Sequence, residues 1–196
     1  MAVISVPQRF KNLVAEQPDR VALSTVNGSF TRAQLEERAD TFARHLRALG
    51  VKQGEMVTMA LPNTEAWVIS AMALWKLGAI PQPVSPRLPV RELEAIIELA
   101  DPPLVLGTPS TPSSSRPLLD VGEWLAENRD ASTETDELPD LISPAWKAPT
   151  SGGSTGRPKL IVSGDPAVHD EDLPVPLLMQ RDGCMVMPGP LYHNGP

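Results

Sequence analysis

Residues 55–86, EMVTMALPNTEAWVISAMALWKLGAIPQPVSP, decide the fold. The apolar run at residues 56–61 is typical of a buried strand, and Asn63 or Thr64 can cap a helix that ends at Gly78. That helix is apolar almost all round, so other elements must cover it on both sides.

Strands and helices continue to alternate beyond this helix. Residues 79–84 predict a second strand, whose prolines favour a sheet edge or an early exit, and residues 104–107 predict a third. Pro89 opens a helix between them, with an inward face made of Leu93, Ile96, Ile97 and Ala100. This β-α-β-α-β order predicts an α/β fold, in which a parallel sheet with right-handed crossovers lies in a layered assembly with helices.

The clearest helix signal lies upstream, in GSFTRAQLEERADTFARHLRALGV at residues 28–51. Thr31 and Gln34 form a capping-box pattern at its start, and Gly50 is the expected stop. His45 lies beside the apolar stripe and is interpreted as a surface histidine. The stripe, with spacings of four and three, consists of Leu35, Ala39, Phe42, Leu46 and Leu49.

Composition restricts the class of protein. A hydrophobic content of 41% is typical of a globular chain, and the single cysteine, Cys184, fits a reducing, cytoplasmic compartment. No secretory signal is recognisable, and the longest apolar run, residues 66–75, is too short to span a bilayer. The net charge of −7 arises from the acidic residues 120–140, and the balanced remainder shows no basic face for nucleic acid.

Connectors and short elements alternate after residue 107. Residues 107–117 are a linker by composition, residues 121–127 predict a short amphipathic helix, and a solvated acidic connector follows to about residue 144. We expect poor order at residues 109–117 and 130–140, because serine, proline and charge bury too little surface to offset the entropy of ordering. Short strands are expected at residues 145–150, 160–162 and 184–187.

Residues 150–159, TSGGSTGRPK, lie between two of these expected strands. A flexible linker would have polar flanks, whereas a Walker P-loop or a Rossmann fingerprint would open a helix. The pattern favours a glycine-rich hairpin loop that wraps a phosphate chain and is mobile enough to release it. Its candidate anion-binding residues are Ser151, Gly152, Gly153, Ser154, Thr155, Gly156 and Lys159.

This loop resembles the phosphate-binding loop of the adenylate-forming superfamily, which includes acyl- and aryl-CoA ligases, luciferases and nonribosomal-peptide adenylation domains. The usual pattern is [Ser/Thr]-Ser-Gly-[Ser/Thr]-Thr-Gly-x-Pro-Lys-Gly, from which Gly152 and Leu160 depart. The double glycine with KLI looks most like the branch of aryl-acid adenylating enzymes and bile-acid-type CoA ligases. MPGPLYHNGP at residues 187–196 resembles a later family motif, and residues 31–86 resemble the usual opening of the family.

The resemblance implies a two-step reaction. A carboxylate attacks the α-phosphate of ATP with Mg²⁺, giving an acyl-adenylate and pyrophosphate, and the thiol of coenzyme A then takes the acyl group. The loop at residues 151–159 would hold the departing phosphates. His193 would be catalytic, because the matching histidine of the family faces the reacting carboxylate. The resemblance assigns no metal ligand to these residues.

The family's adenine-binding segment, its Mg²⁺ ligand and its C-terminal domain would lie beyond Pro196. We therefore expect the N-terminal part of an acid–CoA ligase (an AMP-forming acyl-CoA synthetase, as in fatty acid metabolism) that is inactive by itself. Residues 1–144 would form a first α/β subdomain, and residues 145–196 the start of an ATP-binding subdomain. Self-association through an open apolar face is also expected.

Two alternatives remain open at this point. The same upstream motifs fit an adenylation enzyme that loads a carrier protein, and a non-catalytic relative that binds a nucleotide or an anion. The carboxylic acid itself is not identified by the sequence.

Overall fold

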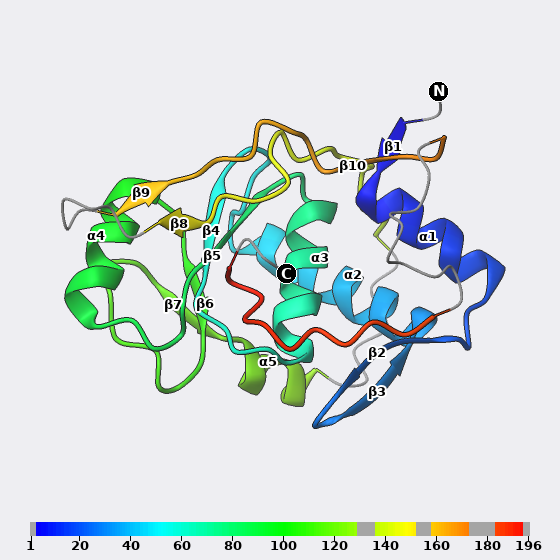
Figure 1. The fold of residues 1–196 in the computed structure, drawn as a ribbon, viewed down its shortest axis with the longest axis horizontal. Helices are drawn as coiled ribbons and strands as arrows, with labels where there is room; N and C mark the ends of the chain where they lie inside the picture. The colour runs from blue at the N-terminus through cyan, green and yellow to red at the C-terminus, as the bar shows by residue number, and fades with distance from the viewer. Residues whose placement is uncertain (1–2, 129–135, 152–157, 173–182, 194–196) are drawn as a thin grey trace.

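The computed structural model of the chain describes residues 3–128, 136–151, 158–172 and 183–193 (Figure 1). The helices are α1 Val6–Glu16, α2 Arg32–Ala48, α3 Glu65–Lys76, α4 Val90–Ala100 and α5 Val121–Glu127. The longer strands are β2 Val21–Thr25, β3 Gly28–Thr31, β4 Met56–Met59 and β5 Ile80–Pro83. The shorter ones are β1 Val3–Ser5, β6 Val105–Gly107, β7 Leu118–Asp120, β8 Thr150–Ser151, β9 Lys159–Leu160 and β10 Val168–Asp170.

A parallel sheet in the strand order β5-β4-β6-β7 forms the centre of the fold. Helices α3 and α4 connect its first three strands in sequence, which confirms the predicted β-α-β-α-β order. The outer position of β5 agrees with the prolines of that strand. The sequence did not predict β7, a three-residue strand that follows the linker-like segment.

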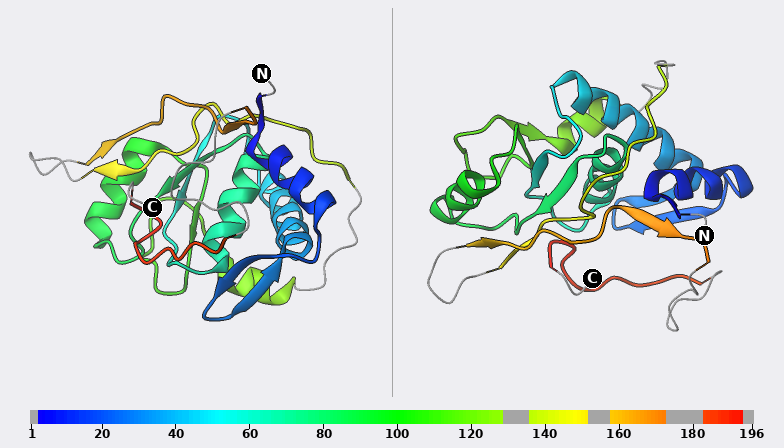
Figure 2. Two further views of the ribbon diagram at one scale, coloured as in Figure 1. Left: turned by 45° about the vertical axis from the view of Figure 1, so that its right-hand side comes forward. Right: turned by 90° about the horizontal axis from the view of Figure 1, so that it is seen from above.

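The two faces of this sheet belong to separate apolar clusters. Helices α2, α3 and α5 cover the face that presents Val57, Met59 and Leu106. Helix α4 covers the opposite face, which presents Ala60 and Val105 (Figures 1 and 2). Successive strand residues point to opposite faces, so β6, and β4 together with Ala60 just after it, supply both clusters. The predicted layered α/β fold is therefore confirmed.

Helix α2 begins as its sequence predicts. The backbone N–H of Gln34 donates to Oγ1 of Thr31 at 3.2 Å, and the N–H of Thr31 donates to Oε1 of Gln34 at 2.9 Å. The apolar stripe is buried except for its last member, since Leu49 is 49% exposed. Leu49 follows the last helical residue, and Gly50 turns the chain there with φ of 92°.

His45 does not lie free on the surface as predicted. Its ring stacks on Trp124 of α5 with 5.1 Å between ring centres, and Phe42 contacts the same indole. Burial lowers the pKa of His45 below its ordinary value of 6.5. The indole comes from an element 79 residues away in sequence, so the helical pattern of α2 did not indicate this contact.

The predicted linker at residues 107–117 is a folded connection. Oγ1 of the buried Thr111 accepts from the N–H of Thr108 at 2.9 Å. The N–H and hydroxyl of Ser115 donate to the Glu94 carboxylate of α4 at 2.8 and 3.0 Å. Serine and threonine hydroxyls can satisfy backbone groups in turns, and the composition alone did not reveal this. The linker prediction, and with it the expected poor order of residues 109–117, is wrong.

The acidic connector is also attached where the structure describes it. Asp136 pairs with the guanidinium of Arg47 at 2.6 Å, and its carbonyl accepts from Nε of Arg44 at 2.9 Å. The hydroxyl of Ser5 donates to the Asp140 carboxylate at 2.8 Å. Asp136 thus has basic partners on α2, but Asp136, Glu137 and Asp140 are all exposed, and the Asp136 side chain is 75% exposed. The expected solvation of the connector is therefore confirmed for residues 136–140. Residues 130–135 lie outside the described residues.

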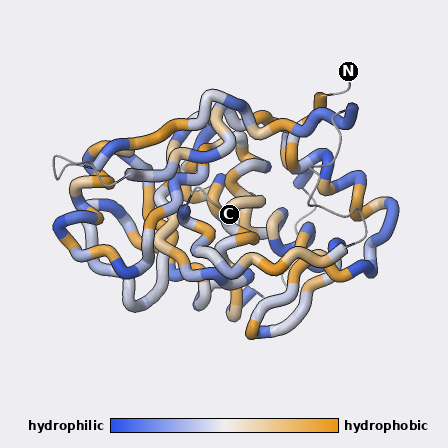
Figure 3. The backbone as a smooth tube through the Cα atoms, viewed as in Figure 1, coloured by the Kyte–Doolittle hydropathy of each residue, from blue (hydrophilic) through white to orange (hydrophobic). Residues whose placement is uncertain are grey.

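Residues 184–187 form no strand, contrary to the prediction. Met185 and Val186 are 49% and 80% exposed, and Figure 3 shows this apolar stretch on the outside of the molecule. A strand needs a neighbour that supplies backbone N–H and C=O groups, and none of the sheets in the described residues includes this segment.

The sequence analysis did not predict the elements near the N-terminus. Strand β1 pairs with β10, and β2 pairs with β3, both antiparallel, while α1 packs against α2. Of the helices in the described part of the chain, none combines the length and the apolar character that crossing a membrane requires.

Candidate functional site

Strands β8 and β9 form an antiparallel hairpin at the base of the predicted phosphate loop. Thr150 pairs with Leu160, and Ser151 pairs with Lys159. The hairpin flanks predicted from the sequence are confirmed, although they are shorter than the expected strands. The loop tip lies outside the described residues, so its anion contacts stay a prediction. The candidate residues concerned are Gly152, Gly153, Ser154, Thr155 and Gly156.

Backbone hydrogen bonds continue to join the two arms below the hairpin. They run from the N–H of Ile161 to the carbonyl of Pro149 at 2.8 Å, from Ser163 to Lys147 at 3.0 Å, and from Trp146 to Asp165 at 2.9 Å. The arms therefore form an irregular ribbon that fixes both ends of the loop. The second arm lies beside α4 (Figure 1).

The first arm meets the sheet at the outer edge of β5. The N–H of Ala148 donates to the carbonyl of Pro81 at 2.9 Å. Ile80 and Val84 donate their N–H groups toward β4. Because backbone groups alternate in direction along a strand, the N–H groups that would point away from β4 belong to positions 81 and 83, and both are prolines. Proline has no N–H, and this edge cannot support a continuous ladder. The strand expected at residues 145–150 is for this reason reduced to Thr150–Ser151.

Aromatic contacts hold the first arm against α3. The indole N–H of Trp75 donates to the carbonyl of Trp146 at 2.9 Å, and the two rings stack with 5.0 Å between centres. Nζ of Lys147 lies 5.9 Å from the centre of the Trp146 ring, and burial lowers the pKa of Lys147. The hairpin thus rises from an arm fixed to both a helix and the sheet.

His193 closes a turn in the last described segment. Its N–H donates to the carbonyl of Pro190 at 3.0 Å, and its ring lies 4.7 Å from that of Tyr192. The residue is exposed, so its imidazole is accessible to a ligand. Figure 2 shows this segment running along the outside of the layers.

Asn63 joins this turn to the sheet. Its Nδ2 donates to the carbonyl of Gly189 at 2.8 Å, and its Oδ1 accepts from the N–H of Leu191 at 2.9 Å. Asn63 lies in the loop that follows β4, at the carboxyl end of an inner strand of the sheet. Ligands of α/β proteins bind at this end of the sheet. The structure therefore places the His193 turn at that edge.

The sequence analysis missed this role of Asn63. It considered Asn63 or Thr64 as the cap of α3, but Thr64 is the N-cap residue and makes no side-chain cap hydrogen bond. The contact joins residues 126 and 128 positions apart, so no local pattern indicates it.

Metal ligands do not gather in the part of the chain that the structure describes. No group of three or more histidine, cysteine, aspartate or glutamate side chains there is arranged to hold a metal ion. We therefore assign none of these residues to Mg²⁺.

Comparison with known proteins links this fold to a family. The family model described as "AMP-binding enzyme" matches residues 10–194. Nonribosomal peptide synthetase 8 of Aspergillus fumigatus is 31% identical over 152 residues, which are 74% of this chain and 2% of that protein. The chain spans between 2% and 25% of the length of eight of its curated relatives.

Solved structures share the fold. The N-terminal subdomain of NpsA from Klebsiella oxytoca, in complex with 3-hydroxybenzoyl-AMSN, has a TM-score of 0.70 at 23% identity, covering 81% of this chain and 40% of that one. NpsA-ThdA, an artificially fused adenylation–PCP di-domain from the same organism, has a TM-score of 0.71 at 23% identity, covering 83% of this chain and 33% of that one.

Proposed function

The chain belongs to the AMP-binding, adenylate-forming enzyme family, and we propose that its protein activates a carboxylic acid with ATP and passes the acyl group to a carrier protein. One observation carries the proposal. Ser151 of β8 pairs with Lys159 of β9 on either side of the glycine-rich sequence 152–157, in a chain that matches the family over residues 10–194. A glycine-rich turn between paired arms suits a phosphate chain, because its backbone N–H groups can point at one anion.

The proposed reaction has two steps. A carboxylate oxygen of the acid bonds to the α-phosphorus of ATP, and the bond to the β-phosphate breaks, so that pyrophosphate leaves. A thiolate then bonds to the acyl carbon, and AMP leaves. Ser151, the loop and Lys159 would hold the leaving phosphates and neutralise their charge, which is how proteins promote phosphoryl chemistry. Mg²⁺ would add charge neutralisation at the same phosphates.

The relatives favour a carrier protein over coenzyme A as the acceptor. The Aspergillus relative is named as a nonribosomal peptide synthetase, and the NpsA-ThdA structure is an adenylation domain fused to a PCP. The CoA ligases of the branch suggested by Gly152 and the KLI stretch gain no support from these relatives, and neither does a role in fatty acid metabolism. The non-catalytic alternative predicts that no acid supports the reaction.

The test is exchange of labelled pyrophosphate into ATP, measured on the natural full-length protein with panels of amino acids and aryl acids. We expect one class of acid to support exchange, followed by transfer to a phosphopantetheine carrier protein. Background exchange with every acid would overturn the proposal. Transfer to coenzyme A, with none to the carrier, would overturn the acceptor that we propose.

Reversing the charge of Lys159 should weaken the binding of pyrophosphate. A hydrogen bond to a charged group contributes about 1.5–3 kcal/mol, so we expect Lys159→Glu to raise the dissociation constant by about 10- to 100-fold. The dissociation constant of Lys159→Gln for pyrophosphate should lie between those of Lys159→Glu and the wild type. Titration calorimetry with pyrophosphate measures the effect, and Lys52→Glu, at an exposed position outside the hairpin, is the matched control. Equal affinities in all four proteins would contradict the assignment.

A further inference from the structure

We propose that Asn63 is a positioning residue, which holds the turn that carries His193 at the carboxyl end of the parallel sheet. The inference rests on the proposed function and on the catalytic role that the family resemblance implies for His193. It starts from the two hydrogen bonds between the Asn63 amide and the backbone of Gly189 and Leu191.

The geometry of these two bonds is that of a strand pair. A residue in a parallel ladder donates to the carbonyl before its partner and accepts from the N–H after it. The Asn63 amide does the same on either side of Pro190, through the carbonyl of Gly189 at 2.8 Å and the N–H of Leu191 at 2.9 Å. Pro190 has no N–H to satisfy. The side chain thus replaces one peptide unit of a neighbouring strand.

An asparagine side chain suits this task better than its analogues. The amide supplies a donor and an acceptor from one short side chain, and both are used. An aspartate of the same length would still accept from Leu191, but its carboxylate would face the carbonyl of Gly189. An alanine would offer neither group.

The turn depends on Asn63 for its place. Within the described residues, the hydrogen bonds that join residues 183–193 to the rest of the chain both come from Asn63. Residues 184–187 just before the turn are exposed and unpaired with any described strand. His193 closes its own turn by donating to Pro190, next to the residues that Asn63 holds. Movement at Gly189 and Leu191 therefore moves His193.

The first experiment is independent of any catalytic activity. Amide hydrogen exchange at Leu191 should be about tenfold faster in Asn63→Ala than in the wild type, because a lost hydrogen bond of this kind changes an equilibrium by about that factor. Asn63→Asp should retain much of the protection. Thr64→Ala is the matched control, because the Thr64 hydroxyl makes no cap hydrogen bond and the variant should exchange like the wild type. Equal exchange at Leu191 in Asn63→Ala and the wild type would overturn the proposal.

The second experiment tests the role in the reaction. In the natural full-length protein, Asn63→Ala should lower kcat for pyrophosphate exchange by about 10- to 100-fold and leave KM for ATP unchanged, because misplacement of a catalytic group costs about that much. Asn63→Asp should recover part of the rate. The double variant Asn63→Ala/His193→Ala should have nearly the same kcat as His193→Ala alone, since both substitutions remove the contribution of His193 to the reaction.

The outcomes separate the two proposals. Faster exchange at Leu191 with an unchanged kcat would overturn the positioning role in the reaction. If the wild-type protein adenylates no acid, the proposed function fails, and the attachment of the turn by Asn63 is still decided by the exchange at Leu191.

Discussion

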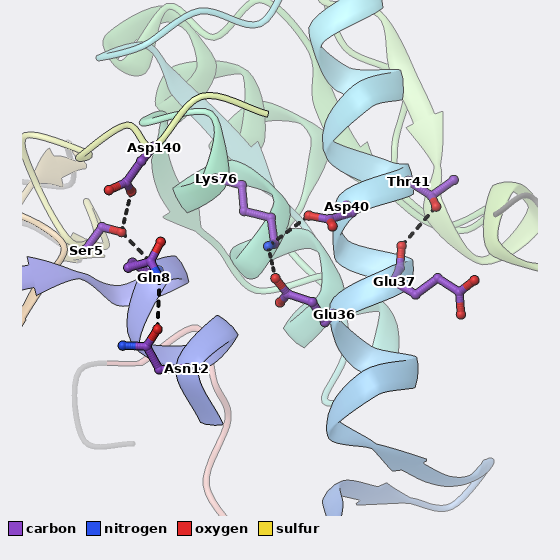
Figure 4. A network of polar contacts seen from close by, with 9 residues as sticks. All are labelled: Ser5, Gln8, Asn12, Glu36, Glu37, Asp40, Thr41, Lys76 and Asp140. Atoms are coloured by element: carbon purple, nitrogen blue, oxygen red, sulfur yellow. Dashed lines mark hydrogen bonds and ion pairs between the residues drawn. The ribbon is translucent and has the colours of Figure 1, made fainter. Parts of the chain in front are cut away.

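Replacing Lys76 with methionine should lower the free energy of unfolding by about 3–5 kcal/mol, the usual cost of leaving a buried charge without its partner. Lys76 lies at the end of α3 and its side chain is 7% exposed. Its Nζ lies 2.6 Å from Oε1 of Glu36 and 2.9 Å from Oδ1 of Asp40, both on α2 (Figure 4). The ion pair therefore joins the two main helices of one face.

The cost arises mainly at Glu36. Its side chain is 12% exposed, and its second oxygen, Oε2, is buried with no hydrogen-bond partner among the described residues. Lys76→Met would leave this buried carboxylate beside the negative charge of Asp40, with the more weakly acting ammonium of Lys11 as a remaining positive charge. Lys76→Met combined with Glu36→Gln should recover a large part of the loss, because the buried charge is then removed as well.

The free energy of unfolding that Lys76→Met loses should become smaller as the pH falls. Burial raises the pKa of Glu36 above its ordinary value of 4.5, and the ammonium of Lys76 opposes this rise. Without Lys76 the folded-state pKa should rise further, so on acidification the folded variant binds a proton before the unfolded chain does. A raised pKa of this kind contributes stability that is present below the unfolded pKa and is lost as the pH rises through the folded pKa.

Urea unfolding at neutral pH and near pH 4.5, the ordinary pKa of Glu36, measures both effects. Lys52→Met is the matched control, since Lys52 is exposed and should change stability by less than about 0.5 kcal/mol. A Lys76→Met variant as stable as the wild type, or a difference that widens in acid, would contradict this account of the pair.

Local signals predicted much of the fold. The capping residues and the apolar stripe of α2 were sufficient to predict that helix, and α5 forms at the predicted residues 121–127. Both depend on side chains within a few positions of each other, and such patterns are readable in one sequence. The parallel order of β4, β5 and β6 followed from the alternation of strands with helices.

Contacts between distant segments could not be predicted in this way. The strand expected at residues 184–187 has an apolar pattern, yet strand formation also needs a neighbour, which the pattern does not supply. The expected strand at residues 145–150 meets Pro81 and Pro83, whose effect depends on which edge of β5 faces the arm. In the candidate site, the hairpin base was readable, but the turn that carries His193 and its link to Asn63 were not.

In the natural full-length protein, His193→Ala should slow adenylate formation by about 10²- to 10³-fold, with little change in the affinity for ATP. The exposed imidazole can donate a hydrogen bond to a carboxylate or phosphoryl oxygen as charge builds during the transfer. It need not act as a general base, because a carboxylate nucleophile has no proton to lose. An interaction made mainly in the transition state lowers the rate more than it weakens binding.

The measurement is single-turnover formation of the acyl-adenylate, with ATP binding measured separately. His193→Gln, which keeps a donor, should be slowed less than His193→Ala, and His169→Ala, at an exposed position on β10, should keep the wild-type rate. The unfolding free energy of His193→Ala should stay within about 0.5 kcal/mol, because an exposed turn residue adds little to the core. Wild-type rates in His193→Ala, or a failure of that variant to fold, would assign the residue to the structure of the turn rather than to the reaction.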